Sequence, residues 1–427
     1  MLASRTLSSD TAALADSTTL ALSYRKEMQH YAEYLISQVS ESGFMKASKT
    51  FDWYSMHWFR DSSFVAMSLL RSSRIIAEDN EELAERMIDA AHRINSFNMG
   101  VVEKRMKSIR NALNTDLSNH GEFFRLSNHV PARIAADGNL HEYDSAQETA
   151  THSWLLQHDS VPLLVCSLYD EMNVKGYQDT SAFLDENKEV LLAYLVKIIK
   201  TECSDAWEER STMLHAYDVG AIYAAIKKIS DSLNTRPETM LRGKGWRIDE
   251  SMLDGGGLAF LKQMFVHDSV IYSQRQPFSD SPDTNFGVDG SEIYLFSQFG
   301  IGKALSDPKI EEETIRKIEE DLFAGNVLPV RYKHDSYRGG GRWLLLGLRY
   351  ADYAISKGQT EKGTRIIDYV ASKFAKELPE QDMVNVETPE EVKADGSIEW
   401  LAWSYGEMLN AMSSFIESQR MGAAAGI

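Results

Sequence analysis

Apolar residues recur at intervals of three and four along most of the 427-residue chain, which is the spacing of amphipathic α-helices. One stripe runs from Tyr24 to Val39 and another from Leu214 to Ile229. The alternation of apolar and polar positions that is typical of strands is scarce, and no strand–helix–strand rhythm is present. The pattern therefore predicts a mostly α-helical protein, with further helices over 60–77, 80–97, 162–174, 186–200, 343–356, 360–376 and 401–417.

Long connections that are rich in Gly and Asp separate the predicted helices. Connections longer than about 12–15 residues are uncommon in compact domains and are often functional. No linker divides the chain, and no repeat of about 20–50 residues is visible. We therefore expect one helical domain over 21–418, with an N-terminal extension over 1–20 and a C-terminal tail over 419–427. The connections run over 112–145, 243–257, 276–291, 333–342 and 378–399.

Acidic residues outnumber basic ones by 63 to 45, so the formal net charge is −18. Such a surface repels phosphate backbones and anionic lipids, which argues against nucleic-acid and membrane partners. The N-terminal segment lacks the basic and apolar stretches of a signal peptide, and no run of about 18 apolar residues is present to span a membrane. Cys166 and Cys203 cannot form a disulfide framework, although a single bridge between them stays open. We expect a cytoplasmic protein.

Four clusters of aromatic and charged residues are candidates for chemistry. The first is Trp58-Phe59-Arg60-Asp61, at the start of a predicted helix. An acidic residue in a first helical turn interacts favourably with the helix dipole, so a capped helix start is one interpretation. A sugar clamp is the other, since an aromatic ring packs on the apolar face of a pyranose while Arg and Asp bond to its hydroxyls. These residues alone favour neither.

The second cluster is Ala206-Trp207-Glu208-Glu209. Adjacent carboxylates repel each other and the indole supplies an apolar wall, and both effects raise a carboxyl pKa toward the range that a general acid needs. On a helix, neighbouring side chains point about 100° apart, so only one of the two glutamates would face a given bond. A solvated acidic helix start is the alternative.

The third cluster spans 331–343, beginning with Arg331 and ending with three glycines before Trp343. The glycines permit a close approach of the backbone, but no Gly-Lys-Ser/Thr follows to form a phosphate-binding loop. The fourth is Pro379-Glu380-Gln381 with Trp403-Ser404-Tyr405 downstream, and such a Pro-Glu-Gln turn is usually an ordinary surface loop. No His-Glu-x-x-His or Cys-x-x-Cys motif predicts a zinc site, and no Gly-x-Ser-x-Gly predicts a nucleophile elbow.

In this order, the clusters resemble glycoside hydrolase family 15, the glucoamylases and their bacterial relatives, from Trp58 to about Met412. The resemblance implies an all-α fold, the (α/α)6 barrel, in which six helical hairpins form a toroid with the active site in loops at one end. It implies that Glu208 is the general acid and Glu380 the general base. The substrate-binding residues that it implies are Trp58, Arg60, Asp61, Trp154, Gln157, Trp207, Glu209, Arg331, Tyr332 and Trp403.

The resemblance also implies an inverting, exo-acting hydrolase that releases β-glucose from the non-reducing end of short α-gluco-oligosaccharides of the isomaltose or maltose type. No metal or organic cofactor is required. The two carboxyl groups are expected to lie roughly 6.5–9.5 Å apart, which leaves room for a water molecule. The loops over 243–291 and 382–399 are expected to wall off the acceptor side. A trehalase-type hydrolase of the same family and a non-catalytic sugar-binding or regulatory relative are the alternatives.

Overall fold

Six helices form a closed inner ring in which each helix contacts the next and the last contacts the first. The computed structural model describes residues 3–49, 52–140, 154–276, 279, 281–374, 377–382 and 398–425. Within these residues the inner ring consists of α2 (Phe59–Ile76), α6 (Ser160–Val174), α8 (Ala216–Asp231), α11 (Glu292–Ser297), α14 (Leu344–Ser356) and α16 (Ala402–Ala425).

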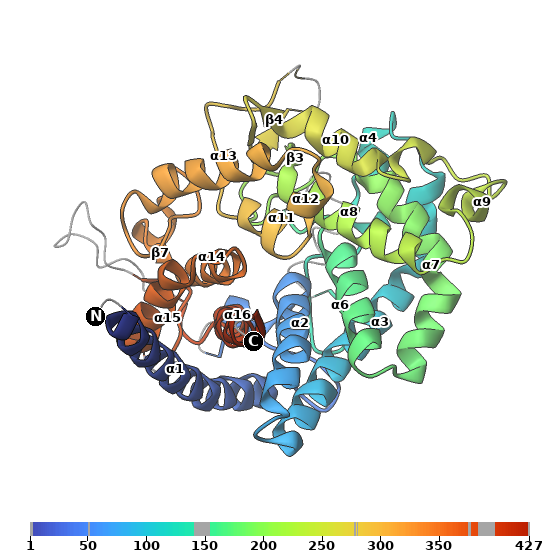
Figure 1. Ribbon diagram of the computed structural model, residues 1–427. Coiled ribbons are helices and arrows are strands. Elements are labelled where there is room, and N and C mark those ends of the chain that lie inside the picture. Colours follow the sequence, from blue (N-terminus) through green and yellow to red (C-terminus); the bar gives the residue numbers. More distant parts are fainter. Residues whose placement is uncertain are drawn as a thin grey trace.

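An outer helix precedes each inner helix in the chain, so the described part of the fold is a series of six hairpins. Figure 1 shows the outer helices around the inner ring. This arrangement confirms the expected (α/α)6 barrel. The outer helices are α1 (Ala3–Gln38), α3 (Glu81–Asn114), α7 (Gln178–Ile198), α10 (Gly256–Phe265), α13 (Pro308–Ile318) and α15 (Thr360–Phe374).

The helices of the two rings differ in how much of their surface is buried. In the inner helix α2 every residue except Arg71 and Arg74 is buried, and in α14 every residue except Ser356 is buried. The outer helix α15 buries only one stripe, which consists of Gly363, Ile366, Ile367 and Val370. A helix that is covered on all sides belongs in the centre of a domain, whereas a single apolar stripe is typical of a helix with one face toward solvent.

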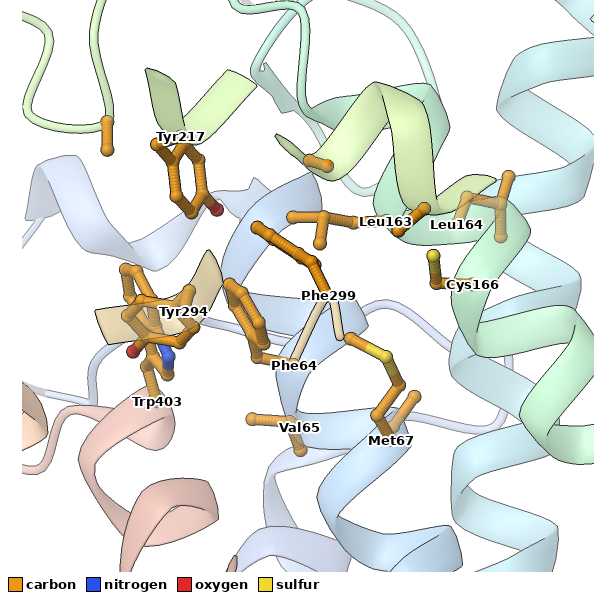
Figure 2. Packing of buried hydrophobic residues seen from close by; sticks show 14 of the residues in the cluster. Phe64, Val65, Met67, Leu163, Leu164, Cys166, Tyr217, Tyr294, Phe299 and Trp403 are labelled. Atoms are coloured by element: carbon orange, nitrogen blue, oxygen red, sulfur yellow. The ribbon is translucent and has the colours of Figure 1, made fainter. Parts of the chain in front are cut away.

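Aromatic side chains from several inner helices fill the interior of the barrel (Figure 2). The ring of Phe64 on α2 stacks on Trp403 of α16, with centroids 5.0 Å apart. Tyr294 on α11 contacts both rings, at 4.9 Å and 5.8 Å, and Tyr217 on α8 packs edge-on against Tyr294. The close packing of α8 and α11 depends on Gly220, because a Cβ there would lie 2.2 Å from a methyl group of Leu295. The barrel therefore has a packed core rather than a channel.

Short antiparallel strand pairs fix the start of several inner helices. In the described residues, β1, β3 and β7 immediately precede α2, α8 and α14, and each pairs with a strand from a distant loop. Each pairing holds the backbone directly before the first turn of the inner helix. The pairs are β1 (His57–Trp58) with β2 (Arg133–Ile134), β3 (Leu214–His215) with β6 (Gln274–Arg275), β4 (Val266–His267) with β5 (Val270–Ile271), and β7 (Arg342–Trp343) with β8 (Gln381–Asp382).

The predicted helices are present, and most ends differ by only a few residues. The exceptions are α3, which continues to Asn114, α7, which begins eight residues earlier than predicted, and α16, which ends eight residues later. Within the described residues, short helices also lie in the connections: α4 (His120–Phe123), α9 (Pro237–Leu241) and α12 (Ile301–Ala304). The predicted domain boundaries at 20/21 and 418/419 fall inside α1 and α16, and the division of the chain stays a prediction. Parts of the expected loops over 112–145, 276–291 and 378–399 lie outside the described residues. Among the helices that are described, none is both long and apolar enough to cross a bilayer.

Candidate active site

A cavity lies at the N-terminal ends of the inner helices α2, α14 and α16. Residues from these helix starts and from three loops converge on it, and both charged and aromatic groups are among them. They are Tyr54, Trp58, Arg60, Asp61, Ala206, Trp207, Glu208, Arg331, Tyr337, Trp343, Leu345, Glu380, Leu401 and Trp403.

Arg60, in the first turn of α2, is buried and is hydrogen-bonded by all three of its nitrogens. Its Nε donates to the Asp159 carboxylate, and its Nη2 donates to the Gln157 side chain. Its Nη1 donates to the Ala206 carbonyl and, at 3.3 Å, to Oε1 of Glu208. Since a guanidinium has five N–H groups, one N–H of Nη2 has no acceptor among the described residues and is left for a ligand. Arg60 thus connects the start of α2 to the loop that carries Glu208.

Glu208 lies in a tight turn rather than on a helix, contrary to the helical geometry considered from the sequence. Its φ is +62°, a left-handed conformation that is uncommon for a residue with a Cβ. The side chain of Asp205 stabilises the turn by accepting from the backbone N–H groups of Trp207, at 3.2 Å, and Glu209, at 2.7 Å. The turn aims consecutive side chains in different directions, so that Glu208 lines the cavity while Glu209 does not.

Burial raises the pKa of Glu208, whereas the Arg60 guanidinium and the Gln157 amide, which donates to Oε1 at 3.1 Å, act to lower it. Burial likewise raises the pKa of Asp61 to about 7, against the opposing charge of Arg60. A carboxyl group with a raised pKa keeps its proton closer to neutral pH, which is a requirement for a general acid.

Glu380 reaches the cavity from the loop between α15 and α16. Its carbonyl accepts from the backbone N–H of Leu344 at 3.1 Å, and its own N–H donates to the Ile398 carbonyl at 2.8 Å, so the loop is tied to the start of α14. Burial raises the pKa of Glu380 to about 8, although Arg331 and Arg338 act to lower it. Within the described residues no group donates to Oε2 of Glu380, which is buried. This oxygen is available to accept a hydrogen bond.

Arg331 is buried in a box of aromatic rings beside the cavity. Asp335 accepts two hydrogen bonds from it, at 2.9 Å and 2.7 Å, and Glu209 accepts a third at 2.7 Å. The hydroxyl of Tyr332 also donates to Glu209. Arg331 is therefore held by Asp335 through two hydrogen bonds. Through Glu209 it is also linked to the turn over 205–209, which we call the acid loop because it contains Glu208. The four rings, with centroids between 4.7 Å and 5.5 Å from the guanidinium carbon, are Trp207, Tyr332, Tyr337 and Trp343.

Three tryptophans of the cavity wall donate their indole N–H to a carboxylate. Trp207 donates to Asp289 and Trp343 donates to Asp335 at 3.1 Å. Trp403 donates to Glu407 at 2.9 Å and stacks on the ring of Phe64. The hydrogen-bonding edge of each ring is therefore occupied. What remains toward the cavity is apolar ring surface, which suits the apolar face of a sugar.

Eight of the twelve predicted site residues line the cavity, and each of the other four contacts a residue that lines it. Gln157 contacts Arg60 and Glu208, while Glu209 and Tyr332 contact each other. Trp154 lies against Trp58, with ring centroids 6.2 Å apart, and does not line the cavity. The eight are Trp58, Arg60, Asp61, Trp207, Glu208, Arg331, Glu380 and Trp403.

Several residues of the site were not singled out from the sequence. Tyr337 and Trp343 belong to the third cluster, so its aromatic content was an available signal. Tyr54, Leu345 and Leu401 line the cavity without any pattern that distinguishes them from core residues. Among the carboxylates that hold these residues, Asp335 belongs to the third cluster and Asp159 lies two positions after Gln157, whereas Asp289 carries no sequence signal of its own.

In the part of the chain that is described, no three His, Cys, Asp or Glu residues are grouped as metal ligands. Cys166 and Cys203 are both buried and unpaired, so the bridge left open by the sequence is not formed. The expected cytoplasmic location stays a prediction.

Known proteins resemble this chain over most of its length. The model of the glycosyl hydrolases family 15 matches residues 23–400. An isomaltose glucohydrolase from Kribbella flavida is 22% identical over 400 residues, which cover 90% of this chain and 91% of the relative. A solved wild-type glycosidase has a TM-score of 0.72 at 21% identity and covers 92% of this chain and 97% of its own. A glucoamylase from Hypocrea jecorina has a TM-score of 0.58 at 16% identity, with 94% and 72% covered.

Proposed function

This chain belongs to the glycosyl hydrolases family 15, and we propose that it is an inverting, exo-acting glucosidase that releases β-glucose from short α-gluco-oligosaccharides. The observation that carries the proposal is the meeting of Glu208 and Glu380, from loops far apart in the chain, in one cavity lined by tryptophan rings. Glycoside hydrolysis requires a carboxylic acid and a second carboxyl group flanking the scissile bond.

In the proposed mechanism Glu208 is the general acid. Burial favours its protonated form, and the proton passes to the glycosidic oxygen as the bond breaks. Glu380 is the general base, and its unpartnered Oε2 accepts a proton from the water that attacks the anomeric carbon. Glu380 is ionised in the active form, and Arg331 and Arg338 favour that form.

The terminal sugar is bound by the start of α2. The free N–H of Arg60 and the carboxyl group of Asp61 provide a donor and an acceptor for neighbouring hydroxyls. The faces of Trp58, Trp207 and Trp403 supply apolar surface. Because Phe64 and Tyr294 fill the barrel beneath Trp403, the cavity has a floor, and a glucan can enter only by its end. This geometry supports exo action.

Among the possible linkages we favour the α-1,6 bond of isomaltose. The support is the isomaltose glucohydrolase of Kribbella flavida, which aligns with 90% of this chain. Specificity for the acceptor sugar depends on loops, which differ most between relatives, so the preference over the α-1,4 bond of maltose is small. A short substrate is favoured over a polymer because the long loops over 243–291 and 382–399 are expected to leave few sugar subsites on the acceptor side.

A substrate panel tests this proposal. The purified protein is given isomaltose, maltose, trehalose, dextran and amylopectin, and kcat/KM is calculated per non-reducing end. We expect the highest value for isomaltose, a comparable value for maltose and lower values for the polymers. A polymer that exceeds every disaccharide would exclude the preference for short substrates. A panel without any release of glucose would exclude the glucosidase itself.

A further inference from the structure

We propose that Asp289, directly before α11, is a positioning residue that fixes the ring of Trp207 and, through it, the orientation of the Glu208 carboxyl group. The inference rests on the function proposed above, because it assigns to Glu208 a direction that matters for proton transfer. Asp289 lies behind the wall of the cavity and does not line it. It therefore acts through Trp207.

The contact between Asp289 and Trp207 is buried and bidentate. The indole Nε1 of Trp207 lies 2.9 Å from Oδ1 and 2.8 Å from Oδ2 of Asp289, so the N–H points between the two oxygens. Oδ1 also accepts from the backbone N–H of Ser291 at 2.7 Å, which orients the carboxylate. Only 4% of Asp289 is exposed, and a hydrogen bond in such low-dielectric surroundings is electrostatically stronger than in water.

The backbone of Asp289 is itself anchored to another part of the site. Asp289 forms an antiparallel bridge with Tyr332, and the N–H of Gly290 donates to the Arg331 carbonyl at 2.6 Å. The N–H of Asp289 donates to the Glu292 side chain at the start of α11. The carboxylate that holds Trp207 is thus fixed relative to Arg331. Asp289 therefore adds a second link between the acid loop and the segment that carries Arg331, beside the contact of Glu209 with Arg331.

This anchor matters because the backbone at Glu208 is strained. A left-handed φ at a residue with a Cβ persists only where the surroundings hold it. Glu208 is held from both sides: Trp207 by Asp289, and Glu209 by Arg331 and Tyr332. Without Asp289, the Trp207 ring loses its hydrogen-bond partner, while Asp205 and Arg60 still hold the backbone of the turn. The ring can then shift against the turn, and the Glu208 carboxyl group no longer points consistently at the glycosidic oxygen.

The kinetic test compares Asp289→Ala and Asp289→Asn with the wild type. A displacement of about 1 Å in a catalytic group lowers the rate by up to about 10²-fold, so we expect Asp289→Ala to lower kcat by about 10–100-fold while KM changes by less than about threefold. Asp289→Asn keeps one oxygen for the indole N–H, and we expect its kcat to lie between that of the wild type and that of Asp289→Ala. The matched control is Glu171→Gln, which removes an equally buried carboxylate, with 0% exposure, near the C-terminal end of α6. It leaves kcat unchanged.

A double substitution shows whether the effect passes through Trp207. In a Trp207→Phe background, which lacks the indole N–H, Asp289→Ala should change kcat by less than about threefold. A loss in that background as large as in the wild type would overturn the proposal. So would wild-type kcat in Asp289→Ala, or an equal loss of kcat in Glu171→Gln.

A measurement without substrate separates this inference from the proposed function. The side-chain indole resonance of Trp207 in a ¹⁵N–¹H NMR spectrum is assigned by its absence from Trp207→Phe. In Asp289→Ala it should move upfield, because the N–H loses its hydrogen-bond acceptor. If the wild type releases no glucose but the resonance moves, the glucosidase proposal fails while Asp289 still holds Trp207. An unmoved resonance would overturn the role of Asp289 whatever the activity.

Discussion

Arg60 contacts the proposed acid directly: its Nη1 donates to Oε1 of Glu208 at 3.3 Å. The same nitrogen donates to the Ala206 carbonyl, so Arg60 holds both the backbone and the carboxyl group of the acid loop. The charge of Arg60 favours the ionised form of Glu208, and burial favours the protonated form. Because burial is the larger effect, the pKa of Glu208 is raised rather than lowered.

Replacing the proposed acid should abolish turnover but not binding. Glu208→Gln keeps the size of the side chain and the acceptor for Arg60, but it has no proton to give to the leaving oxygen. We expect kcat on isomaltose to fall by about 10³-fold or more, while the affinity for glucose, measured by calorimetry, changes little. A variant with one tenth of wild-type kcat would remove Glu208 from this role.

The stereochemistry of the product tests Glu380. If Glu380 activates water rather than attacking the sugar, an α-linked substrate must first give β-glucose. The anomeric proton signals during the first minutes of hydrolysis distinguish the two anomers, before mutarotation mixes them. Initial α-glucose would mean retention, which requires a nucleophile and would contradict the roles proposed for both glutamates.

The fold follows largely from the hydrophobic pattern. Long amphipathic stripes, as from Tyr24 to Val39, place helices reliably, because one buried face recurs at a helical period. The pattern does not distinguish inner from outer helices in advance. In α2 the buried positions include polar residues such as Ser68 and Ser72, which are satisfied within the barrel and do not look apolar in the sequence.

The sequence predicts residues of the site only where several of them lie together in a short motif. Arg60, Glu208 and Glu380 lie in such clusters, and all three meet in the cavity. Asp289 does not, because its role arises from a contact with a residue 82 positions away. The turn at Glu208 was also not predictable, since its left-handed φ is stabilised by the side chain of Asp205 and by distant anchors rather than by a glycine.

The pH dependence of activity should report the ionisation of Glu380. A base must be ionised, so kcat/KM falls as the pH decreases through the pKa of Glu380, which burial raises to about 8. Arg338 acts to lower this pKa, so Arg338→Gln should move the acid limb to higher pH, by roughly one unit or less. The control is Arg365→Gln, on the exposed face of α15. A shift to lower pH, or an equal shift in the control, would contradict the assignment.

Glu380 should also cost the protein stability at alkaline pH. Its pKa is about 8 in the folded protein, compared with a usual value of 4.5, so the folded state binds this proton more tightly than the unfolded state does. Raising the pH from about 4.5 to 8 therefore favours unfolding, and below about 4.5 the effect vanishes because both states are protonated. Glu380→Gln removes the titration. We expect the variant to be more stable than the wild type at pH 8.5, by on the order of 1–3 kcal/mol, and equally stable at pH 4.

Thermal unfolding at the two pH values measures this difference. A Glu33→Gln variant, at an exposed position of α1, is the control and should unfold like the wild type at both. If Glu380→Gln unfolds at a lower temperature than the wild type at pH 8.5, then Arg331 and Arg338 stabilise the ionised carboxylate by more than burial disfavours it. The pKa of Glu380 would in that case lie below its usual value, and the acid limb of kcat/KM would have to lie there too. The two experiments therefore test the same ionisation from independent sides, one in the presence of substrate and one without it.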